Sequence, residues 1–598
     1  MPKVKIVWKT LVFAIILSMA KESIENIRHS LAHLLAGAVL ELWPDAKPAI
    51  GPVIENGFYY DFEFAEPISE DDLPKIENKM REILKAWDKF EEIEEDEKSA
   101  RKIYKGNPYK EELVEELIKN GDKITSYKSG DFVDLCRGGH VKSAKNIDPK
   151  SFKLTSLAGA YWHGSEKNKM LTRVYGVAFE TKKELEEYLA ALEEAKKRDH
   201  RKLGKQLDLF TFSDLIGSGL PLYTPKGAFI RRALNEYIES LQTKAGYTQV
   251  WTPQIAKAEL FKVSGHYDKY REGMFRVISN YSEEEFYLKP MNCPQHTQIY
   301  ASQMRSYRDL PLRYTDFAML YRDEKPGELN GLARVRSFSQ DDCHIFCRED
   351  QVDEEVDIAL AMTKEVMATF GFKYRYCLST RDKKHPEKYL GEPEAWNKVE
   401  KWAEKIMKRN GIDYFDAPGE AAFYAPKMDL LVTDALGREW QLSTVQIDFV
   451  MPQRFGLTYA DKDGKEKSPI MIHRAIIGSP ERFIMILLEH YAGAFPLWLS
   501  PVQVVVAPIS DSQQKYAAEV CEKLKEEGIR VEFYDQNETI GKKIREAEMQ
   551  KVPYVAVIGQ KEVDAEAVAV RKRSQGDLGQ MKIEEFIEKI KEKIIDKK

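Results

Sequence analysis

Two pairs of side chains with the same short spacing could carry chemistry near the start of the chain. His29 and His33 stand four positions apart in the apolar stretch RHSLAHLLAGAVLELW, and Cys136 and His140 stand four apart in DLCRGGH. Residues four apart on a helix face the same side, so the histidines could hold a metal, act as catalytic bases or pack in a core. Imidazole and thiolate are zinc ligands, and the two pairs together make a possible set of four.

A zinc protease is one alternative for the histidine pair. Its H-E-x-x-H motif has the same spacing, but a glutamate after the first histidine acts as the general base. This chain has Ser30 at that position, which argues against a protease. Ordinary packing of both histidines inside an apolar helix is the other alternative, and the second pair in DLCRGGH weakens it.

Arginines gather around a predicted hairpin further along the chain. The segment 312–346 contains two strand-like runs that flank a loop with proline and glycine. Planar guanidinium groups present paired donors that suit a phosphate ester, although a solvated charged hairpin is the alternative. The residues that frame the loop are Arg322, Glu324, Arg334 and Arg336.

Two further elements lie on either side of this hairpin in the sequence. Before it, the apolar spacing predicts a helix over 229–241, followed by a strand-like run. After it, a strand-like run ends at Gly478, and Ser479 can cap the helix that follows. Arg482 would then lie near the start of this helix, where anions bind well.

These three elements, in this order, resemble the three signature motifs of class II aminoacyl-tRNA synthetases. The stretches LKPMNCPQH, YRDE…GLARVRSFSQDDCHIF, FYAPKMDL and WQLSTVQIDF are similar to the threonyl-tRNA synthetase family in particular, and the resemblance covers 24–598. It implies a threonine–tRNA ligase that activates threonine with ATP to threonyl-adenylate and transfers it to the 3′ end of tRNA(Thr). It also implies that the N-terminal domain hydrolyses mischarged seryl-tRNA(Thr).

The resemblance assigns phosphate contacts to the charged residues of the second and third motifs. Arg322 matches the family arginine on the α-phosphate, and Arg482 matches the one on the γ-phosphate side. Arg334 matches another phosphate-binding position, while Glu324 matches the residue that contacts the adenine. Cations lower the barrier at a phosphorus centre, and Mg²⁺ with ATP is expected for the same reason.

Cys293, His344 and His473 match the family's zinc ligands. Taken one at a time they would be a buried thiol and two core imidazoles, because their spacing has no recognisable metal signature. Three protein ligands with an open position is the catalytic pattern of zinc, and one Zn²⁺ per subunit is implied. Such a zinc could bind the amino and hydroxyl groups of threonine, whereas an apolar pocket rejects the isosteric valine poorly. The implied substrate residues are Asp342 for the ammonium group and Tyr424, Lys427, Gln441 and Gln446 along the pocket.

Serine creates the need for a second site. It keeps the hydroxyl group, and the loss of one methyl costs only ~1–3 kcal/mol. The resemblance implies that His29, His33, Cys136 and His140 handle the seryl ester and its attacking water rather than a metal. Lys110 and Asp134 match further residues of that editing site. Gly139 stands where the family usually has proline, which is expected to loosen the loop before His140.

The predicted fold is multidomain, with α+β and α/β parts. We expect an N-terminal α+β editing domain over 19–180, a charged linker helix over 181–205, and a class II catalytic core on an antiparallel sheet over 206–498. Strand–helix alternation predicts a doubly wound α/β anticodon-binding domain over 499–598.

The C-terminal domain carries the expected anticodon contacts. Asn537, Glu562 and Arg571 match family positions that read anticodon bases, which polar side chains can read on their edges. The stretches 541–551 and 571–573 are locally basic, as phosphate contacts require, although a solvated helix face is the alternative for the first.

The first residues of the chain differ from the rest. Lysines precede the apolar run 11–17, which resembles a secretory signal and is too short to span a bilayer. We expect translation to start at Met19, with 1–18 absent from the working protein. Relatives in bacteria usually carry a ubiquitin-like domain before the editing domain, and we expect this chain to lack it.

Composition limits the remaining choices. The chain of 598 residues is 43% apolar and 31% charged, with six cysteines and a formal net charge of −6, so nucleic acid must be bound by local basic patches. Sparse cysteines without a C-x-x-C pair favour a cytoplasmic setting. A homodimer through the first motif is implied by the resemblance. A regulatory RNA-binding paralogue, a ligase for serine and a ligase without editing stay open as alternatives.

Overall fold

The structure, a computed structural model, describes residues 23–165, 167–434 and 437–597. The expected leader at 1–18 lies outside the described residues. The chain divides into two compact units, the first ending at Glu193 and the second beginning at Glu194. Among the described helices, none is long and apolar enough to cross a membrane.

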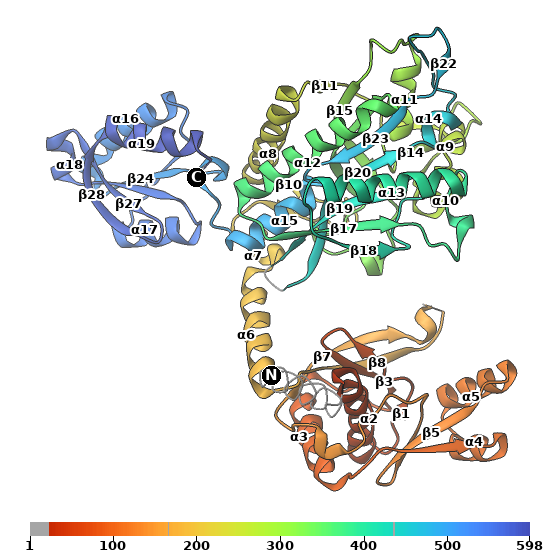
Figure 1. The fold of residues 1–598 in the computed structure, drawn as a ribbon. Helices are drawn as coiled ribbons and strands as arrows, with labels where there is room; N and C mark the ends of the chain where they lie inside the picture. The colour runs from red at the N-terminus through yellow and green to blue at the C-terminus, as the bar shows by residue number, and fades with distance from the viewer. Residues whose placement is uncertain (1–22, 166, 435–436, 598) are drawn as a thin grey trace, which may run out of the picture. The chain divides into compact units, whose positions relative to one another are not determined.

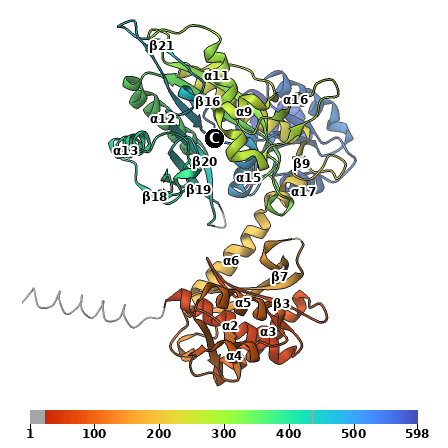
Figure 2. The ribbon, with the colours of Figure 1, turned by 90° about the vertical axis from the view of Figure 1, so that its right-hand side faces the viewer.

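A buried helix and an antiparallel sheet form the centre of the N-terminal unit. Ser23 caps helix α2 (Ile24–Leu42), and twelve residues of this helix are buried, His33 among them. Helix α3 (Leu73–Ala86) lies beside α2 (Figure 2). The sheet has the order β1-β3-β8-β7 with β2 paired to β3. Its strands are β1 (Lys47–Pro48), β2 (Val53–Ile54), β3 (Gly57–Glu63), β7 (Phe152–Tyr161) and β8 (Met170–Ala178).

A smaller sheet completes this unit. The order is β4-β5-β6, all antiparallel. Asn107 caps helix α5 by accepting hydrogen bonds from the backbone N–H of Tyr109 and Lys110, which places Lys110 in the first turn. Strand β6 carries Asp134 and leads directly to Cys136. The elements are β4 (Glu91–Glu95), α4 (Glu97–Ile103), α5 (Pro108–Asn120), β5 (Ile124–Ser129) and β6 (Phe132–Leu135).

Two helices follow the N-terminal sheet. They are α6 (Lys182–Arg198) and α7 (His200–Gln206), and Asp199 caps α7. The boundary between the two units falls within α6. Both helices fall within the stretch expected as one linker helix, apart from the last residue of α7.

An eight-stranded sheet forms the core of the second unit (Figure 1). Its strand order is β11-β15-β16-β23-β20-β19-β17-β18. The six strands from β15 to β17 along this order are mutually antiparallel, while β11 and β18 are parallel edge strands. The strands are β11 (Thr248–Gln249), β15 (Leu312–Tyr321), β16 (Ser337–Cys347), β17 (Tyr374–Thr380), β18 (Tyr414–Pro418), β19 (Lys427–Thr433), β20 (Glu439–Asp448) and β23 (Ile470–Ala475).

Long helices pack against this sheet in the largest hydrophobic core of the described residues. They are α8 (Pro225–Lys244), α12 (Val352–Phe370), α13 (Pro393–Arg409) and α15 (Pro480–Tyr491). Ser479 caps α15 and Pro480 begins it, as expected. The shorter elements of this unit are β9 (Phe210–Thr211), β10 (Leu222–Tyr223), β12 (Ile255–Lys257), α9 (Ala258–Ser264), α10 (His266–Tyr270), β13 (Arg276–Val277), β14 (Phe286–Leu288), α11 (Cys293–Ala301), α14 (Met451–Arg454), β21 (Tyr459–Ala460) and β22 (Glu466–Lys467).

The C-terminal part has a five-stranded sheet with the order β25-β24-β26-β27-β28. Alternation along β24 sends Val504 and Val506 into a core with α16 and α19, while Val505 and Ala507 pack with α17 on the opposite face. Helices therefore cover both faces, as in a doubly wound fold, although β27 and β28 run antiparallel. The elements are β24 (Val504–Pro508), α16 (Gln514–Glu526), β25 (Val531–Phe533), α17 (Ile540–Met549), β26 (Tyr554–Ile558), α18 (Gln560–Ala565), β27 (Ala567–Lys572), β28 (Gly576–Lys582) and α19 (Ile583–Ile595).

Candidate active sites

Three side chains that are far apart in the sequence meet on the large sheet. His344 on β16 lies directly opposite His473 on β23, and Cys293 is the first residue of α11. Their candidate ligand atoms all lie within 4.8 Å of one another, and all three residues are buried. Nε2 of His344 is 3.1 Å from Nδ1 of His473. One thiol and two imidazoles with no fourth protein ligand in the set match the donors of a catalytic zinc site.

Burial sets the protonation of these groups. It raises the pKa of the Cys293 thiol well above its usual range, so a thiolate there needs a cation beside it. It lowers the pKa of His344 well below its usual range, which keeps a lone pair available on the neutral ring. The residues present therefore fit a bound divalent metal.

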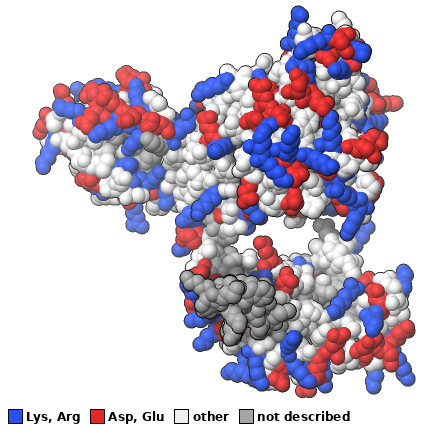
Figure 3. Space-filling model, in the orientation of Figure 1, with Lys and Arg blue, Asp and Glu red and all other residues white. Residues whose placement is uncertain are grey.

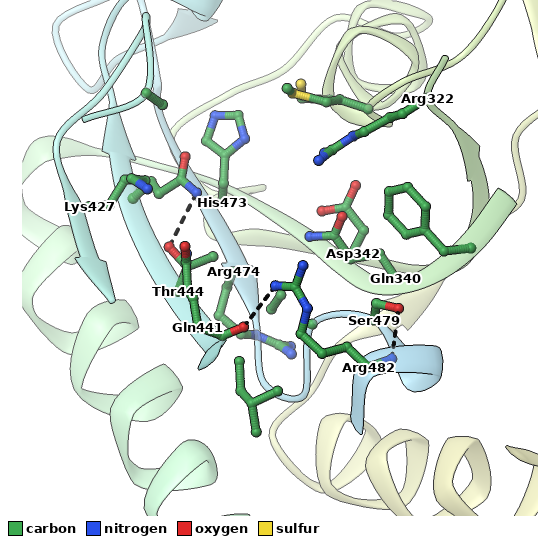
Figure 4. A pocket seen from close by; sticks show the side chains of 18 of the residues that line it. Arg322, Gln340, Asp342, Lys427, Gln441, Thr444, His473, Arg474, Ser479 and Arg482 are labelled. Atoms are coloured by element: carbon green, nitrogen blue, oxygen red, sulfur yellow. Dashed lines mark hydrogen bonds between the residues drawn. The ribbon is translucent and has the colours of Figure 1, made fainter. Parts of the chain in front are cut away.

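A cavity of about 320 Å³ opens above this cluster. Figure 4 shows Arg322 and Arg482 pointing into it from different elements, with Asp342 between them. All twelve residues proposed from the sequence for the metal, the phosphates and the amino acid line this one cavity. They are Cys293, Arg322, Glu324, Arg334, Asp342, His344, Tyr424, Lys427, Gln441, Gln446, His473 and Arg482.

The three arginines proposed for the phosphates come from the hairpin β15–β16 and from the start of α15. Arg482 donates to the backbone oxygens of Ala333 and Gln441, each at 3.2 Å. Arg334 pairs with Glu324 at 2.8 Å, while Arg322 stacks on the ring of Phe338. Burial first, and then repulsion from the other two arginines, lowers the pKa of Arg482. An anion in the cavity would relieve this repulsion, so the arrangement favours a polyphosphate.

Polar groups at the sheet end of the cavity suit a small amino acid. Burial raises the pKa of the Asp342 carboxyl to about 7, and a nearby ammonium group would stabilise its charged form. The Tyr424 ring stacks on His473 with 4.7 Å between ring centres. Oε1 of Gln446 is buried without a hydrogen-bond partner among the described residues. Such an acceptor costs free energy unless a bound molecule donates to it.

Lys427 and Gln441 share a partner at the edge of the same cavity. Nζ of Lys427 lies 3.0 Å from Oδ2 of Asp429, and Nε2 of Gln441 donates to Oδ1 of that carboxylate at 2.8 Å. Asp429 therefore holds both side chains in place at the cavity wall.

A second cavity, of about 540 Å³, lies in the N-terminal unit. His29 and His33 from α2 meet the segment after β6, where Sγ of Cys136 is 3.4 Å from Nε2 of His29 and 3.3 Å from Nε2 of His140. Lys110 pairs with Asp134 at 2.5 Å, and both side chains are buried. The structure thus brings together all six residues expected for editing, five of them along the cavity wall.

Burial favours the neutral forms of the histidines and the thiol at this second cavity. Burial lowers the pKa of His140 to about 2 and that of His33 well below its usual range. Burial also raises the pKa of the Cys136 thiol to about 11. Neutral imidazoles can accept hydrogen bonds from a water molecule, so this geometry can orient water for hydrolysis.

The loop before His140 departs from what a proline would allow. Gly139 has φ = +91°, whereas proline is restricted to about −65°. A Cβ at this position would come within 3.4 Å of Nδ1 of His29. The glycine therefore permits the positive φ of this loop, and a proline would force a different path.

Three family models match separate segments of the chain. Residues 124–175 match the family described as the second additional domain of threonyl and alanyl tRNA synthetases. Residues 275–491 match the class II core domain of tRNA synthetases for G, H, P, S and T, and residues 503–593 match an anticodon-binding domain.

Relatives of known name extend the match to nearly the whole chain. The threonine–tRNA ligase of Thermus thermophilus is 51% identical over 577 residues, which cover 94% of this chain and 87% of that protein. That of Rubrobacter xylanophilus is 48% identical over 575 residues, which cover 95% and 89%. The chain belongs to the threonine–tRNA ligase family.

Solved structures of threonine–tRNA ligases share the fold. The RNA-binding domain of threonyl-tRNA synthetase from Cryptosporidium parvum is 39% identical with a TM-score of 0.63, and the match covers 66% of this chain and 98% of that one. A putative threonyl-tRNA synthetase from Aeropyrum pernix is 29% identical with a TM-score of 0.59, covering 67% and 96%. The resemblance and the fold class expected from the sequence are confirmed, and a zinc protease is excluded.

Sequence reasoning missed several residues of the synthetic cavity, the one beside Cys293, His344 and His473, and Phe338 and Gln340 are two of them. Both lie on β16 with Asp342 and His344, and these four alternate residues line the cavity together. Successive side chains on a strand point to opposite faces, so the period of two along SFSQDDCHIF was the signal that could have found them.

The three expected anticodon residues lie on separate elements of the C-terminal sheet. Asn537 is exposed between β25 and α17, Glu562 lies in the first turn of α18, and Arg571 lies on β27. Glu562 accepts a hydrogen bond from the backbone N–H of Gly559 at 2.9 Å, and Arg571 lies 4.0 Å from Asp577. No measured contact joins the three among the described residues.

Two basic residues of this region are committed to the protein itself. Arg573 donates to the backbone oxygens of Ala494 and Phe495 at 3.0 and 2.7 Å. Lys543 is buried and donates to the oxygen of Pro508 at 3.0 Å. The expectation that the stretches containing them serve phosphate contacts is therefore wrong for these two, because their side chains hold the fold together.

Proposed function

We propose that the chain activates threonine with ATP and transfers it to tRNA(Thr). The observation that carries this proposal is the cavity itself, in which the Cys293–His344–His473 cluster and the arginines of the second and third motifs share one space. A set of metal-binding side chains beside a polyphosphate-binding surface suits a reaction that joins a small polar acid to a phosphate. Family membership supports the same reaction.

The residues of the cavity divide the work. Arg322, Arg334 and Arg482 bind the phosphates of ATP and neutralise the charge that develops at phosphorus, while Glu324 contacts the adenine. Asp342 binds the substrate ammonium group, and Tyr424, Lys427, Gln441 and Gln446 position the amino acid. Cys293, His344 and His473 would hold a zinc ion, which would bind the amino and hydroxyl groups that valine cannot both offer.

The N-terminal cavity supports a hydrolytic role. We infer that His29, His33, Cys136 and His140 orient the seryl ester and its attacking water, with Lys110 and Asp134 holding the wall behind them. A variant with both His33→Ala and Cys136→Ala should hydrolyse seryl-tRNA(Thr) much more slowly than the unchanged enzyme. Equal rates for the two proteins would refute the editing role.

The C-terminal part supports anticodon recognition. Asn537, Glu562 and Arg571 are offered as its contacts, since exposed and half-exposed polar groups can read splayed bases. Lys and Arg side chains are mixed with Asp and Glu over the face in Figure 3, so tRNA contacts must come from local patches. A homodimer through the first motif and a cytoplasmic setting complete the proposal.

One assay separates this ligase from the alternatives. ATP–pyrophosphate exchange is measured with threonine, serine and valine, together with the zinc content of the protein. Exchange should be fast with threonine, slower with serine and very slow with valine, at about one zinc per chain. A regulatory paralogue would show no exchange, and a metal-free protein that still rejects valine would contradict the proposed metal site.

A further inference from the structure

The proposed metal ligand His473 has a charged partner behind it. Its Nε2 lies 2.9 Å from Oδ2 of Asp448, whereas its Nδ1 faces His344 and the cavity. Asp448 is fully buried at the end of β20, and His473 is 4% exposed. The carboxylate therefore acts on the ring nitrogen that does not face the proposed ion.

Asp448 is itself held in a fixed orientation. Its other oxygen, Oδ1, accepts hydrogen bonds from the backbone N–H groups of Val450 at 2.6 Å and Met451 at 2.9 Å, where α14 begins. A backbone N–H can only donate, so Oδ1 is committed as an acceptor. Oδ2 is left to face His473, and a carboxylate oxygen can only accept from the ring.

This geometry selects one form of the imidazole. Nε2 of His473 must carry the ring proton and donate it to Asp448, so Nδ1 keeps its lone pair toward Cys293 and His344. We propose that Asp448 is a positioning residue that holds His473 in the tautomer able to bind the metal. The inference rests on the metal site of the proposed function and concerns a residue outside its ligand set.

The other histidine ligand has a different support. Nδ1 of His344 lies 2.8 Å from Nδ1 of His296, and Nε2 of His296 lies 2.8 Å from the side-chain amide of Asn292. Lys289 can only donate, and it donates to the amide oxygen of Asn292 at 2.9 Å, so the NH₂ group of Asn292 faces His296. Nδ1 of His296 then carries the proton toward Nδ1 of His344, and Nε2–H of His344 faces Nδ1 of His473. This side of the site therefore also requires the lone pair of His473 on Nδ1, as the contact with Asp448 does.

Two substitutions at one position distinguish tautomer control from packing. In Asp448→Asn the shape is kept, and the amide oxygen is needed by Val450 and Met451. The NH₂ group then faces Nε2 of His473, where two donors would meet. His473 must move its proton to Nδ1, and it loses the lone pair that binds the metal. Asp448→Ala removes the acceptor but introduces no donor.

The test measures metal affinity rather than catalysis. The full chain is stripped of metal, and Zn²⁺ or Co²⁺ binding is measured by competition with a chelator, with the visible absorption of the cobalt–thiolate site as a second readout. Asp448→Ala should weaken binding by about 10–100-fold, as the loss of an outer partner does. Asp448→Asn should weaken binding further, despite being isosteric.

Asp341→Asn is the matched control. Asp341 is also fully buried and accepts from the backbone N–H of Ile476 and Ile477 at 2.7 and 3.3 Å, but it faces Arg474. Binding by this variant should stay close to the unchanged protein, and thermal unfolding of each metal-free variant reports on folding.

The outcomes separate this inference from the function on which it rests. If the Asp448→Asn variant binds metal as tightly as the Asp448→Ala variant, or more tightly, the proposed role of Asp448 is wrong. If Cys293→Ser leaves the affinity of the otherwise unchanged protein intact, the metal site itself is wrong, and the inference falls with it.

Discussion

At the scale of residues, the main feature of the synthetic cavity is an excess of positive charge. Arg322, Arg334 and Arg482 line one space, and Arg334 alone of the three has carboxylate partners among the described ion pairs, Glu324 and Glu328. Burial and mutual repulsion make Arg482 harder to keep charged. The arginines repel one another in the empty cavity, and a bound polyphosphate relieves that repulsion. Positive groups fixed in this way stabilise the negative charge of the transition state.

Arg322→Ala should reduce ATP–pyrophosphate exchange by about 10²–10³-fold, the typical effect of losing one preorganised donor. The exchange rate of Arg322→Lys should lie between those of Arg322→Ala and the unchanged enzyme, because lysine keeps the charge but lacks the planar pair of donors. Among the described residues, the side chain of Arg322 makes one hydrogen bond, to the Pro290 oxygen at 3.4 Å, so thermal unfolding should change little. Exchange that survives Arg322→Ala would remove the residue from the phosphate site.

A buried ion pair in the editing cavity gives a second prediction at this scale. Lys110→Ala would leave the Asp134 carboxylate buried and without its cation, since both side chains are about 3–4% exposed. Removal of one partner of such a pair costs about 3–5 kcal/mol. Calorimetry of the full chain should show a lower unfolding temperature for the N-terminal unit.

Lys123→Ala is the matched control for this prediction. Lys123 pairs with Glu94 on the exposed surface of the same unit, and an exposed pair contributes about 0–1 kcal/mol. Similar losses in the two variants would mean that the Lys110–Asp134 pair is not the stabilising contact described above.

Secondary structure elements bring the distant residues together. Strands β16, β23 and β20 run side by side, and their register aligns His344, His473 and Gln446 in one row across the sheet. In the N-terminal unit, one turn of α2 presents His29 and His33 to the segment after β6. A one-residue slip on any of these strands would turn its functional side chains to the opposite face.

The cluster of histidines beside α2 should make the N-terminal unit sensitive to acid. The pKa of His140 is about 2 in the folded chain and about 6.5 when unfolded. Below pH 6.5 the unfolded form therefore binds more protons, and stability falls as pH falls. Between pH 6.5 and 5 this one group removes up to about 2 kcal/mol, and His33 acts in the same direction.

Calorimetry at pH 7 and pH 5 checks this dependence. The unfolding temperature of the N-terminal unit should drop at pH 5, and His140→Asn should reduce the drop, since asparagine does not titrate. An equal drop in both proteins would show that other groups control the acid response.

At the scale of the whole molecule, synthesis, editing and tRNA recognition occupy separate regions of the chain. The two cavities belong to different compact units, and the expected anticodon contacts lie on a third sheet. Changes confined to one region should therefore affect one activity, provided that the change does not unfold the region.

Arg571→Ala tests this separation. The variant should charge tRNA(Thr) less efficiently, with the loss mainly in KM for tRNA, while ATP–pyrophosphate exchange stays unchanged. Each readable base contact is worth about 1–3 kcal/mol by analogy with other nucleic-acid contacts. Arg571 pairs only loosely with Asp577, at 4.0 Å, so folding should be preserved. Equal loss of charging and exchange would argue against a role at the anticodon.

The sequence alone determined the family, the fold class, twelve residues that line the synthetic cavity and five that line the second cavity. Local signals explain part of this result, because capping, strand alternation and the spacing of His29 and His33 depend on neighbours in the chain. Resemblance supplied the rest, as Cys293, His344 and His473 have no local pattern that joins them.

Tertiary structure alone decided which side chains were free to act. Asp448 behind His473, the alternation that adds Phe338 and Gln340, and the positive φ of Gly139 all depend on contacts between segments distant in sequence. The same holds for Arg573 and Lys543. In the sequence they belong to basic stretches that suggest phosphate contacts, but in the fold their side chains donate hydrogen bonds to backbone oxygens. A hydrogen bond is settled by the position of both partners, and a linear sequence specifies only their identities.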